Sequence, residues 1–190
     1  MPDPNPQALD FLLNRRSRPQ KTLVDPVPDR AALEPILTAA LRTPDHGKLE
    51  PWRLLVLDRA ALSALALLAK ERGAALGKDE AEIAKGAMQY ETGGLAVVVI
   101  ESPVESEKIP AIEQIYSAGA VCLALLNAAL AAGWGANWLS GWASHDRDFV
   151  EQGLGLASHE RVAGLIHIGT EKATPPERPR PDLEGKVTWL

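Results

Sequence analysis

The chain has very little cysteine and no recognisable export or membrane segment. Cys122 is the one cysteine among 190 residues, so neither an intramolecular disulfide nor a cysteine-based zinc site can form. No stretch resembles a cleaved signal peptide. The longest apolar helical segment contains Asn127 and many alanines and glycines, so a transmembrane helix is not predicted. These absences favour a protein of the reducing cytoplasm.

An excess of positive charge is also missing. Lysine and arginine total 20 and aspartate and glutamate total 25, which gives a formal net charge of −5. Proteins that bind nucleic acid generally neutralise its phosphates with basic surfaces. A general nucleic-acid role is therefore disfavoured, although a small anionic ligand could still bind at a local cluster of cations.

The sequence lacks the short motifs of several common enzyme classes. It contains no G-x-S-x-G nucleophile elbow and no G-x-x-x-x-G-K-[ST] phosphate loop. The segment GWGANW lacks the third glycine of a dinucleotide fingerprint, and it follows a helical pattern instead of a strand. A serine hydrolase, a P-loop enzyme and a Rossmann enzyme are therefore disfavoured.

The four histidines do not form a metal-binding pattern. His46, His145, His159 and His167 lie far apart in the sequence, without H-x-H or H-E-x-x-H spacing, so no metal site is predicted. His167 lies within a strand pattern, which favours a structural role. His145 and His159 are expected at helix boundaries on the surface.

The chain does contain enough apolar residues for one core, arranged in alternating helical and strand patterns. With 46% hydrophobic residues, we expect a single domain that spans residues 1–190. Apolar spacing predicts helices at 6–14, 29–41, 60–75, 78–88 and 109–133, a short helix ending at Gly153 or Gly155, and strands at 52–57, 95–100, 133–142 and 162–168. Pro35 predicts that the second helix is either kinked or starts later than a cap at Asp29 would place it. Three or four strands with five or six helices indicate an α+β or α/β sandwich with a small, helix-covered sheet.

The C-terminal segment 171–190 is rich in proline and is expected to be extended. It is either a disordered end or an arm that lies on another surface. The apolar residues near its end, Val187, Trp189 and Leu190, favour the arm.

Two clusters of functional side chains remain. In NRRSRP, residues 14–19, consecutive arginines and a serine close a helix, and guanidinium forks match phosphate oxygens. The alternative is a helix end whose carbonyls are satisfied by cations. In RTPDHGKLEPW, residues 42–52, Arg42 and His46 could reach a ligand while Pro44 and Pro51 hold the shape of the loop. The alternative there is a solvated connection.

The order of four segments is typical of one family. The segments are RRS (15–17), RTPDHGKLEPWRLLVL (42–57), SAGAVCLALLNAALAAGWGANWLSG (117–141) and VAGLIHIGT (162–170). Together they resemble the nitroreductase family of FMN-dependent oxidoreductases, in particular its small bacterial NAD(P)H nitroreductase branch. The likeness covers nearly the whole chain, and it favours the binding interpretation of both clusters.

The resemblance implies an α+β nitroreductase-like sandwich with a small central mixed sheet, assembled as an interlocked homodimer with FMN at the subunit interface. Arg15, Arg16 and Ser17 would hold the flavin from one subunit, and Arg42 and His46 would approach it from the other. The later flavin-binding segment would be Trp138, Leu139 and Ser140. Members of this branch often have Trp-Arg-Ser there, so Leu139 offers only backbone groups or packing. The segment assigned to nicotinamide nucleotide binding in such relatives corresponds to Ala128, Ala129, Leu130, Ala131, Ala132 and Gly133.

The implied mechanism is alternation at one site. NADH or NADPH reduces FMN and leaves, and an electron-poor acceptor such as a nitroaromatic or a quinone takes its place. Neither a catalytic side chain nor a metal is required, because the flavin performs the redox chemistry. An arginine near flavin N1 and O2, Arg15 or Arg16, would stabilise the anionic reduced ring. The C-terminal arm could wrap around the partner, bringing Arg178 or Arg180 to the phosphate.

Two alternatives stay open on the sequence alone. The first is an enzyme of the same fold with another reductive chemistry, such as dehalogenation or flavin fragmentation. The second is a flavin-binding protein without turnover, which is suggested by Leu139 in the place of an arginine.

Overall fold

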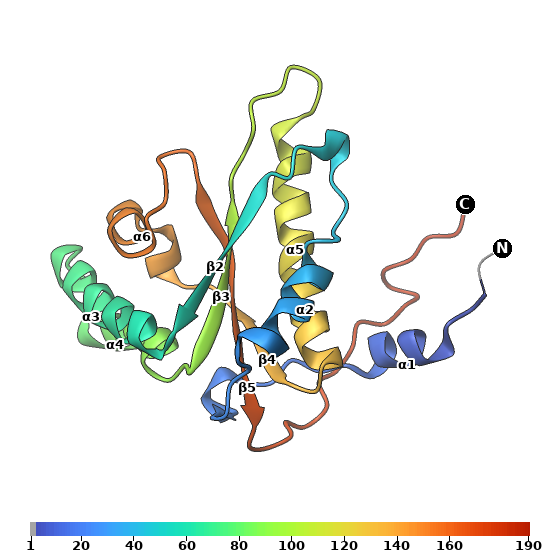
Figure 1. The fold of residues 1–190 in the computed structure, drawn as a ribbon, viewed down its shortest axis with the longest axis horizontal. Helices are drawn as coiled ribbons and strands as arrows, with labels where there is room; N and C mark the ends of the chain where they lie inside the picture. The colour runs from blue at the N-terminus through green and yellow to red at the C-terminus, as the bar shows by residue number, and fades with distance from the viewer. Residues whose placement is uncertain (1–2) are drawn as a thin grey trace.

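The computed structural model describes residues 3–190 and places one five-stranded sheet between two layers of helices (Figure 1). The strand order is β1-β5-β3-β2, and β4 also pairs with β5. The strands are β1 (Leu23–Val24), β2 (Trp52–Asp58), β3 (Leu95–Glu101), β4 (Gly135–Leu139) and β5 (Arg161–Glu171). The helices are α1 (Pro6–Asn14), α2 (Arg30–Ala40), α3 (Arg59–Ala75), α4 (Glu80–Glu91), α5 (Ala111–Ala131) and α6 (Arg147–Leu154). Short 3-10 turns, η1 (Gln20–Thr22), η2 (His46–Lys48) and η3 (Trp142–His145), complete the fold.

The sheet corrects one part of the sequence prediction. Every strand pair in the described residues is antiparallel, whereas a mixed sheet was expected. The chain leaves β2 at Asp58, passes through the α3–α4 hairpin, and enters β3 at Leu95, which lies directly opposite Asp58. Because two helices return the chain to the end of the sheet that it left, β3 must run antiparallel to β2.

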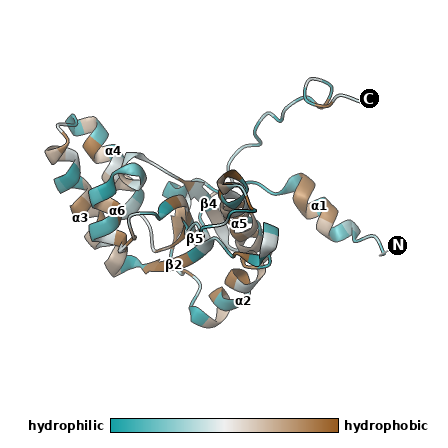
Figure 2. Cartoon of the chain, turned by 90° about the horizontal axis from the view of Figure 1, so that it is seen from above, coloured by the Kyte–Doolittle hydropathy of each residue, from teal (hydrophilic) through white to brown (hydrophobic). Residues whose placement is uncertain are grey.

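The core has two halves, one on each face of the sheet. All seven residues of β3 are buried, as its unbroken apolar run predicted. Val98 and Ile100 pack toward α3, α4 and α6, while Val97 and Val99 pack toward α2 and α5. Successive side chains of a strand point to opposite faces, so this one strand serves both halves. Seen from above, the two helical layers lie on opposite sides of the sheet (Figure 2).

The predicted helices are confirmed, and aspartates set several of their starts. Asp29, Asp58, Asp79 and Asp146 each accept a hydrogen bond from a backbone amide of the first turn. The start of α2 is therefore at Arg30, and Pro35 lies inside the helix. The expectation of a later start is wrong, because the Asp29 cap stabilises the first turn. At the other end of α6, Gly155 adopts the left-handed conformation that ends a helix, with φ of 65°.

By length and composition alone, helix α5 could cross a membrane. Its packing is that of a core helix, however, because it lies against α2 and the sheet strands β3, β4 and β5. One side of α5 is left uncovered in the single chain. The exposed residues there are Ile112, Ile115, Tyr116 and Leu123.

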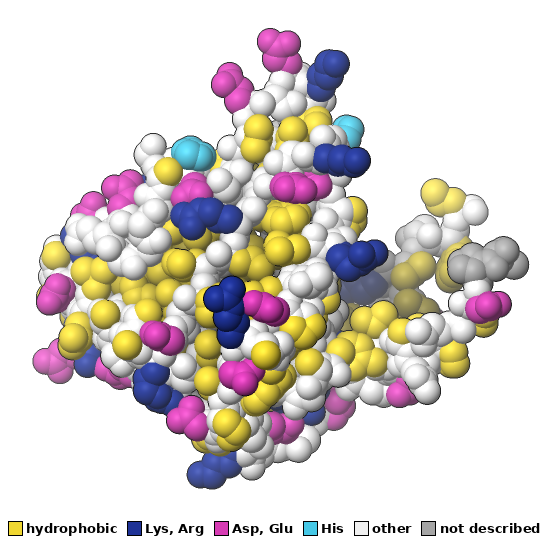
Figure 3. Space-filling view, viewed as in Figure 1, with side chains coloured by type: hydrophobic (Ala, Val, Ile, Leu, Met, Phe, Trp, Pro, Cys, Tyr) yellow, Lys and Arg dark blue, Asp and Glu magenta, His cyan; other side chains and the backbone are white. Residues whose placement is uncertain are grey.

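The two ends of the chain project from the same side of the molecule (Figures 1 and 2). Helix α1 has no buried residue, and its apolar side chains Leu9, Leu12 and Leu13 are exposed. Residues 172–190 form no helix or strand, and Trp189 is 87% exposed. On the face in Figure 3, cationic and anionic side chains are interspersed without a large patch of one sign.

Candidate functional site

Two adjoining cavities lie along the segment from Arg15 to Lys21, next to β4. The first has a volume of about 550 Å³ and is enclosed by η1, α4, the end of β4 and η3. The second has a volume of about 450 Å³ and lies between α1, the arginines that follow it and the end of α5. The backbone amide of Arg18 donates to the Ala136 carbonyl over 2.8 Å, which fixes this segment against β4. The same short segment therefore forms a wall of both cavities.

The first cavity contains a buried amide that has no partner. Gln89 of α4 is 7% exposed and lines the cavity, and its Nε2 has no hydrogen-bond partner among the described residues. Gln20 donates from its own Nε2 to the Gln89 backbone oxygen over 2.8 Å. A Cβ on Gly141 would lie 3.1 Å from the Gln89 Nε2, so the glycine allows the amide to reach this position. Buried polar groups are normally paired, and this donor is therefore available to a ligand.

The second cavity is lined by three arginines, of which Arg18 pairs with Glu171 over 3.0 Å while Arg15 and Arg16 form no ion pair among the described residues. Arg15 and Arg16 are half-buried, and the Nε of each has no partner among the residues described. The Arg15 Nη1 lies 3.4 Å from Asn127 Oδ1, and the Arg16 Nη1 donates to the Ser17 carbonyl over 3.2 Å. Burial, followed by repulsion from Arg180 and Arg16, lowers the pKa of Arg15. An anion placed here would relieve both the repulsion and the loss of hydration.

The strand β4 divides its predicted residues between the two faces of the sheet. Leu139 and Ser140 line the first cavity together with Asn137. The side chain of Trp138 points to the opposite face, where its Nε1 would lie 2.2 Å from a Cβ on Gly164. Side chains alternate along a strand, so Trp138 can approach a ligand in this cavity only through its backbone.

Arg42 and His46 lie elsewhere in the chain. His46 lines a third, open cavity of about 400 Å³ beside α5, together with Glu113 and Tyr116, whereas Arg42 is exposed after α2. The His46 Nδ1 is 2.7 Å from the Glu113 Oε2 at the first turn of α5. Asn127, which contacts Arg15, follows Glu113 by 14 residues on this helix. At the rise of an α-helix the two positions are about 21 Å apart, so one chain alone does not bring His46 to the arginines.

The segment predicted to bind a nicotinamide nucleotide forms the end of α5. Ala129 is buried in the core, and Ala128 and Leu130 pack partly against it. Ala131, Ala132 and Gly133 are exposed, and Leu130 and Gly133 also line the second cavity. The first half of the segment therefore packs in or against the core, and the second half is exposed at the end of α5.

The other three histidines do not form a second candidate site. His167 is 1% exposed, as a structural role predicted, and burial lowers its pKa to about 4. His145 and His159 are exposed, as expected. Within residues 3–190, no group of three or more histidine, cysteine, aspartate or glutamate side chains could hold a metal ion.

Sequence reasoning missed Gln20 and Gln89. Neither belongs to a motif, and a glutamine on a helix normally indicates a solvated face. The one available signal is that Gln89 lies between Ala87 and Tyr90 on what becomes the buried side of α4.

Comparisons of the sequence and of the structure with known proteins agree on one family. A family model described as "Nitroreductase family" matches residues 12–170. The curated "Putative NAD(P)H nitroreductase YdjA" of Escherichia coli K12 is 31% identical over 163 residues, which cover 86% of this chain and 87% of that protein. Among solved structures, a nitroreductase-like family protein from Bacillus cereus has a TM-score of 0.78 at 22% identity and covers 100% of this chain and 98% of its own. A "putative nitroreductase in complex with FMN" from Desulfovibrio desulfuricans has a TM-score of 0.74 at 20% identity and covers 99% of both chains.

Proposed function

The chain belongs to the nitroreductase family, and from this premise we propose that it is an FMN-dependent oxidoreductase that takes electrons from NADH or NADPH. The similar protein from Escherichia coli is named for NAD(P)H, and the similar structure from Desulfovibrio desulfuricans contains FMN. Electron-poor nitroaromatics or quinones are the proposed acceptors. When bound, FMN supplies hydride and electron transfer, so the residues of the chain need only bind, orient and protect it.

The two adjoining cavities fit the two ends of FMN. Arg15 and Arg16 are proposed to bind the phosphate, because their buried Nε groups lack an acceptor and a dianion would offset their mutual repulsion. Arg180 of the C-terminal segment can add to this group, since its Nη2 lies 3.4 Å from the Arg15 carbonyl oxygen. Ser17 lies between the phosphate end and the first cavity. There, the free Gln89 amide is proposed to bind a polar edge of the flavin ring.

A homodimer is proposed because the site is incomplete in one chain. His46 is remote from Arg15, Arg42 lines neither of the two adjoining cavities, and the exposed face of α5 next to His46 carries apolar side chains that a second copy would cover. In such a pair, the His46 loop of one chain would reach the flavin held by the other. The exposed stripe of α1 and the extended segment after Glu171 are further surfaces suited to a partner, with the whole chain acting as one domain.

The proposed reaction alternates between two substrates. NADH or NADPH would bind over the flavin and leave before the acceptor enters the same open cavity. At the end of α5, Leu130 and Gly133 are the proposed contacts for the nucleotide, because they line the second cavity.

The observation that carries this proposal is the pair of arginines with unpartnered buried nitrogens in the second cavity, next to the first cavity, which Leu139 and Ser140 line. Replacing Arg16 with alanine should weaken FMN binding by roughly tenfold to a hundredfold, because a charge-assisted hydrogen bond contributes about 1.5–3 kcal/mol. Titration of the apoprotein with FMN, followed by flavin fluorescence, measures the change.

The matched control is Arg30→Ala. Arg30 begins α2 with a side chain that is 93% exposed, so its loss should leave FMN affinity unchanged. Equal affinity of the Arg16→Ala variant and the unaltered protein would contradict the phosphate role and return these arginines to a helix-end interpretation.

A further inference from the structure

We propose that His46, held by Glu113, donates a proton to the electron acceptor at the flavin site of the partner subunit. This inference rests on the proposed function and adds a catalytic residue, His46, and a positioning residue, Glu113, to it. Neither the family match nor the names of the relatives assign a proton donor.

The contact between the two side chains fixes the histidine ring. Their 2.7 Å separation joins Nδ1 of His46, in the turn η2, to Oε2 of Glu113, in the first turn of α5. A carboxylate at this distance accepts the Nδ1 hydrogen and stabilises the charged imidazole. Nε2 then remains on the opposite edge of the ring, free to give or take a proton. Within residues 3–190, Glu113 is the one hydrogen-bond partner of the His46 ring.

The backbone on both sides of His46 is also anchored. Ser117 of α5 donates from Oγ to the Pro44 carbonyl over 3.1 Å, and Trp52 donates from Nε1 to the same Oγ over 3.0 Å. On the other side, Asp45 accepts the backbone amide of Glu50 with Oδ2 over 3.1 Å. Because both the His46 ring and the backbone around it are held, His46 should lose less conformational entropy when it acts on a substrate.

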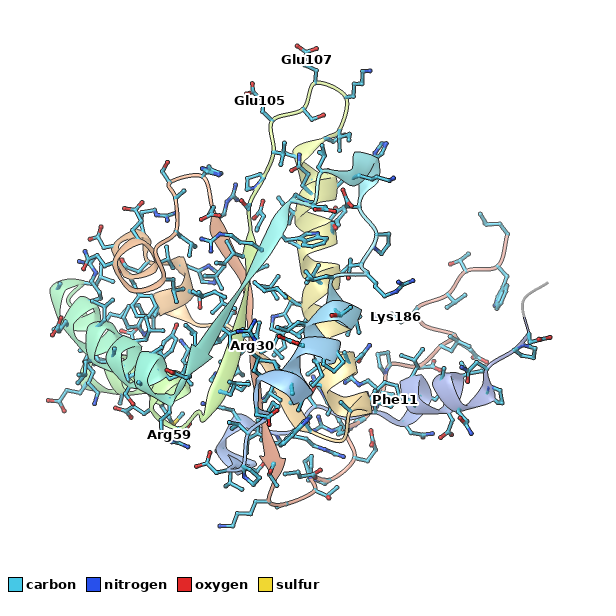
Figure 4. The ribbon with its side chains drawn as sticks, in the orientation of Figure 1. Phe11, Arg30, Arg59, Glu105, Glu107 and Lys186 are labelled. Atoms are coloured by element: carbon cyan, nitrogen blue, oxygen red, sulfur yellow. The ribbon has the colours of Figure 1, made fainter. Side chains whose placement is uncertain are left out.

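Few other charged or titratable groups compete for His46. Tyr116 of α5 lines the same cavity and is 67% exposed. The carboxylate of Asp45 is occupied by backbone amides, and Lys48 is exposed on the same loop. The loop between β3 and α5 also lies nearby, because the side chain of Ile109 packs on Gly47. This loop carries Lys108, and Glu105 and Glu107 project from its tip (Figure 4). Glu113 is thus the anion placed to orient the ring.

The location of the pair points to the partner's site. The cavity beside His46 continues into the exposed side of α5 at Tyr116 and Ala120, the surface that a second copy is proposed to cover. The arginines of the same chain lie about 21 Å along α5, beyond the reach of a histidine side chain. Two-fold pairing places the same residues of each chain at the other's site, so one contact surface yields two complete sites.

The chemistry needs a proton source. Two-electron reduction of a quinone to the quinol adds one hydride and one proton, and the bound FMN supplies the hydride with its electron pair. His46 supplies the proton: the Nε2–H bond breaks as an O–H bond forms on the acceptor oxygen. The electron pair of the N–H bond stays on the imidazole, and solvent returns the proton. Glu113 holds the Nδ1 hydrogen throughout.

The test separates reduction of the flavin from its reoxidation, with protein saturated with FMN. Reoxidation by a quinone under anaerobic stopped flow should slow on the order of 100-fold in both His46→Gln and Glu113→Ala, the typical contribution of a general acid. The rate should depend on pH in the unaltered protein, and His46→Gln should remove that dependence. Glu105→Gln, at the tip of the neighbouring loop, is the control and should behave like the unaltered protein.

A second readout does not depend on turnover. Nitrogen NMR of the apoprotein should show the His46 hydrogen at Nδ1 at high pH, and Glu113→Ala should shift the ring toward the Nε2 form. Unchanged reoxidation and pH dependence in both variants, with flavin bound and reduced normally, would overturn the proton-donor role alone. A neutral ring that carries its hydrogen at Nε2 at high pH in the unaltered protein would overturn it too. A chain that binds no added FMN would overturn the proposed function and this role together.

Discussion

At the scale of single residues, some polar groups that lack a hydrogen-bond partner lie beside a cavity, and others are buried away from the cavities. Arg15, Arg16 and Gln89 have unpaired nitrogens beside cavities, where a ligand can satisfy them. His167 has two unpaired ring nitrogens within the described fold, but it lies in the middle of β5 and lines none of the three cavities. Unpaired groups beside a cavity indicate binding, whereas the buried histidine affects stability.

The His167 ring should make stability depend on pH. Burial lowers the pKa of His167 from an ordinary value of 6.5 to about 4, so between these values the unfolded chain takes up a proton that the folded chain refuses. The free energy of unfolding therefore falls as the pH drops from 6.5 to 4, by about 2 kcal/mol at pH 5. Urea unfolding at pH 7 and pH 5 measures the loss.

His167→Gln should remove most of this loss, whereas the exposed His159→Gln should retain it. Glu160, whose pKa is lowered to about 2 chiefly by its hydrogen bond with Arg53, loses its stabilising effect only below pH 4.5, so it does not affect the comparison of pH 7 with pH 5. An unchanged difference between pH 7 and pH 5 in His167→Gln would show that another group is responsible.

At the scale of secondary structure, apolar spacing predicted α5 and β3 well, because their burial follows directly from their composition. The two-residue strand β1 was missed, since Leu23 and Val24 gain their strand character from pairing with Thr170 and Glu171. Strand direction was also missed, because it depends on the α3–α4 hairpin and not on the residues of the strands. Pairing with distant parts of the chain cannot be read from local patterns.

The exposed face of α5 is the main contact surface of the proposed dimer. Leu123 is 45% exposed at the middle of this face, so Leu123→Arg would bury an unpaired charge at the interface and should convert the dimer to a monomer. Light scattering coupled to size-exclusion chromatography measures the mass directly.

The control for this variant is Leu67→Arg. Leu67 is 63% exposed on α3, on the opposite side of the sheet, and the same charge there should leave the assembly intact. A Leu123→Arg protein that stays dimeric would move the interface away from α5.

At the scale of the whole molecule, the sequence motifs predicted most residues of the candidate site. No single motif predicted that these residues lie at two separate places in one chain. Arg15, Arg16 and Ser17 lie together at one end of α5, with Leu139 and Ser140 at the neighbouring cavity. His46 lies toward the other end of α5, and Arg42 lines none of the three cavities. Gln89 came only from the structure, because its burial depends on how α4 packs over η1 and η3. The resemblance implied a site that two subunits share. The distance between His46 and the arginines in a single chain is the geometric reason to propose it.

The most direct test of the account is anaerobic reduction of the FMN-saturated protein. We expect NADH or NADPH to bleach the bound flavin, and a nitroaromatic or quinone added after removal of the nucleotide to restore its colour. That sequence of events requires one site that serves two substrates in turn. A protein that binds FMN but is bleached by neither nucleotide would contradict the proposed reaction and leave a flavin-binding protein without turnover.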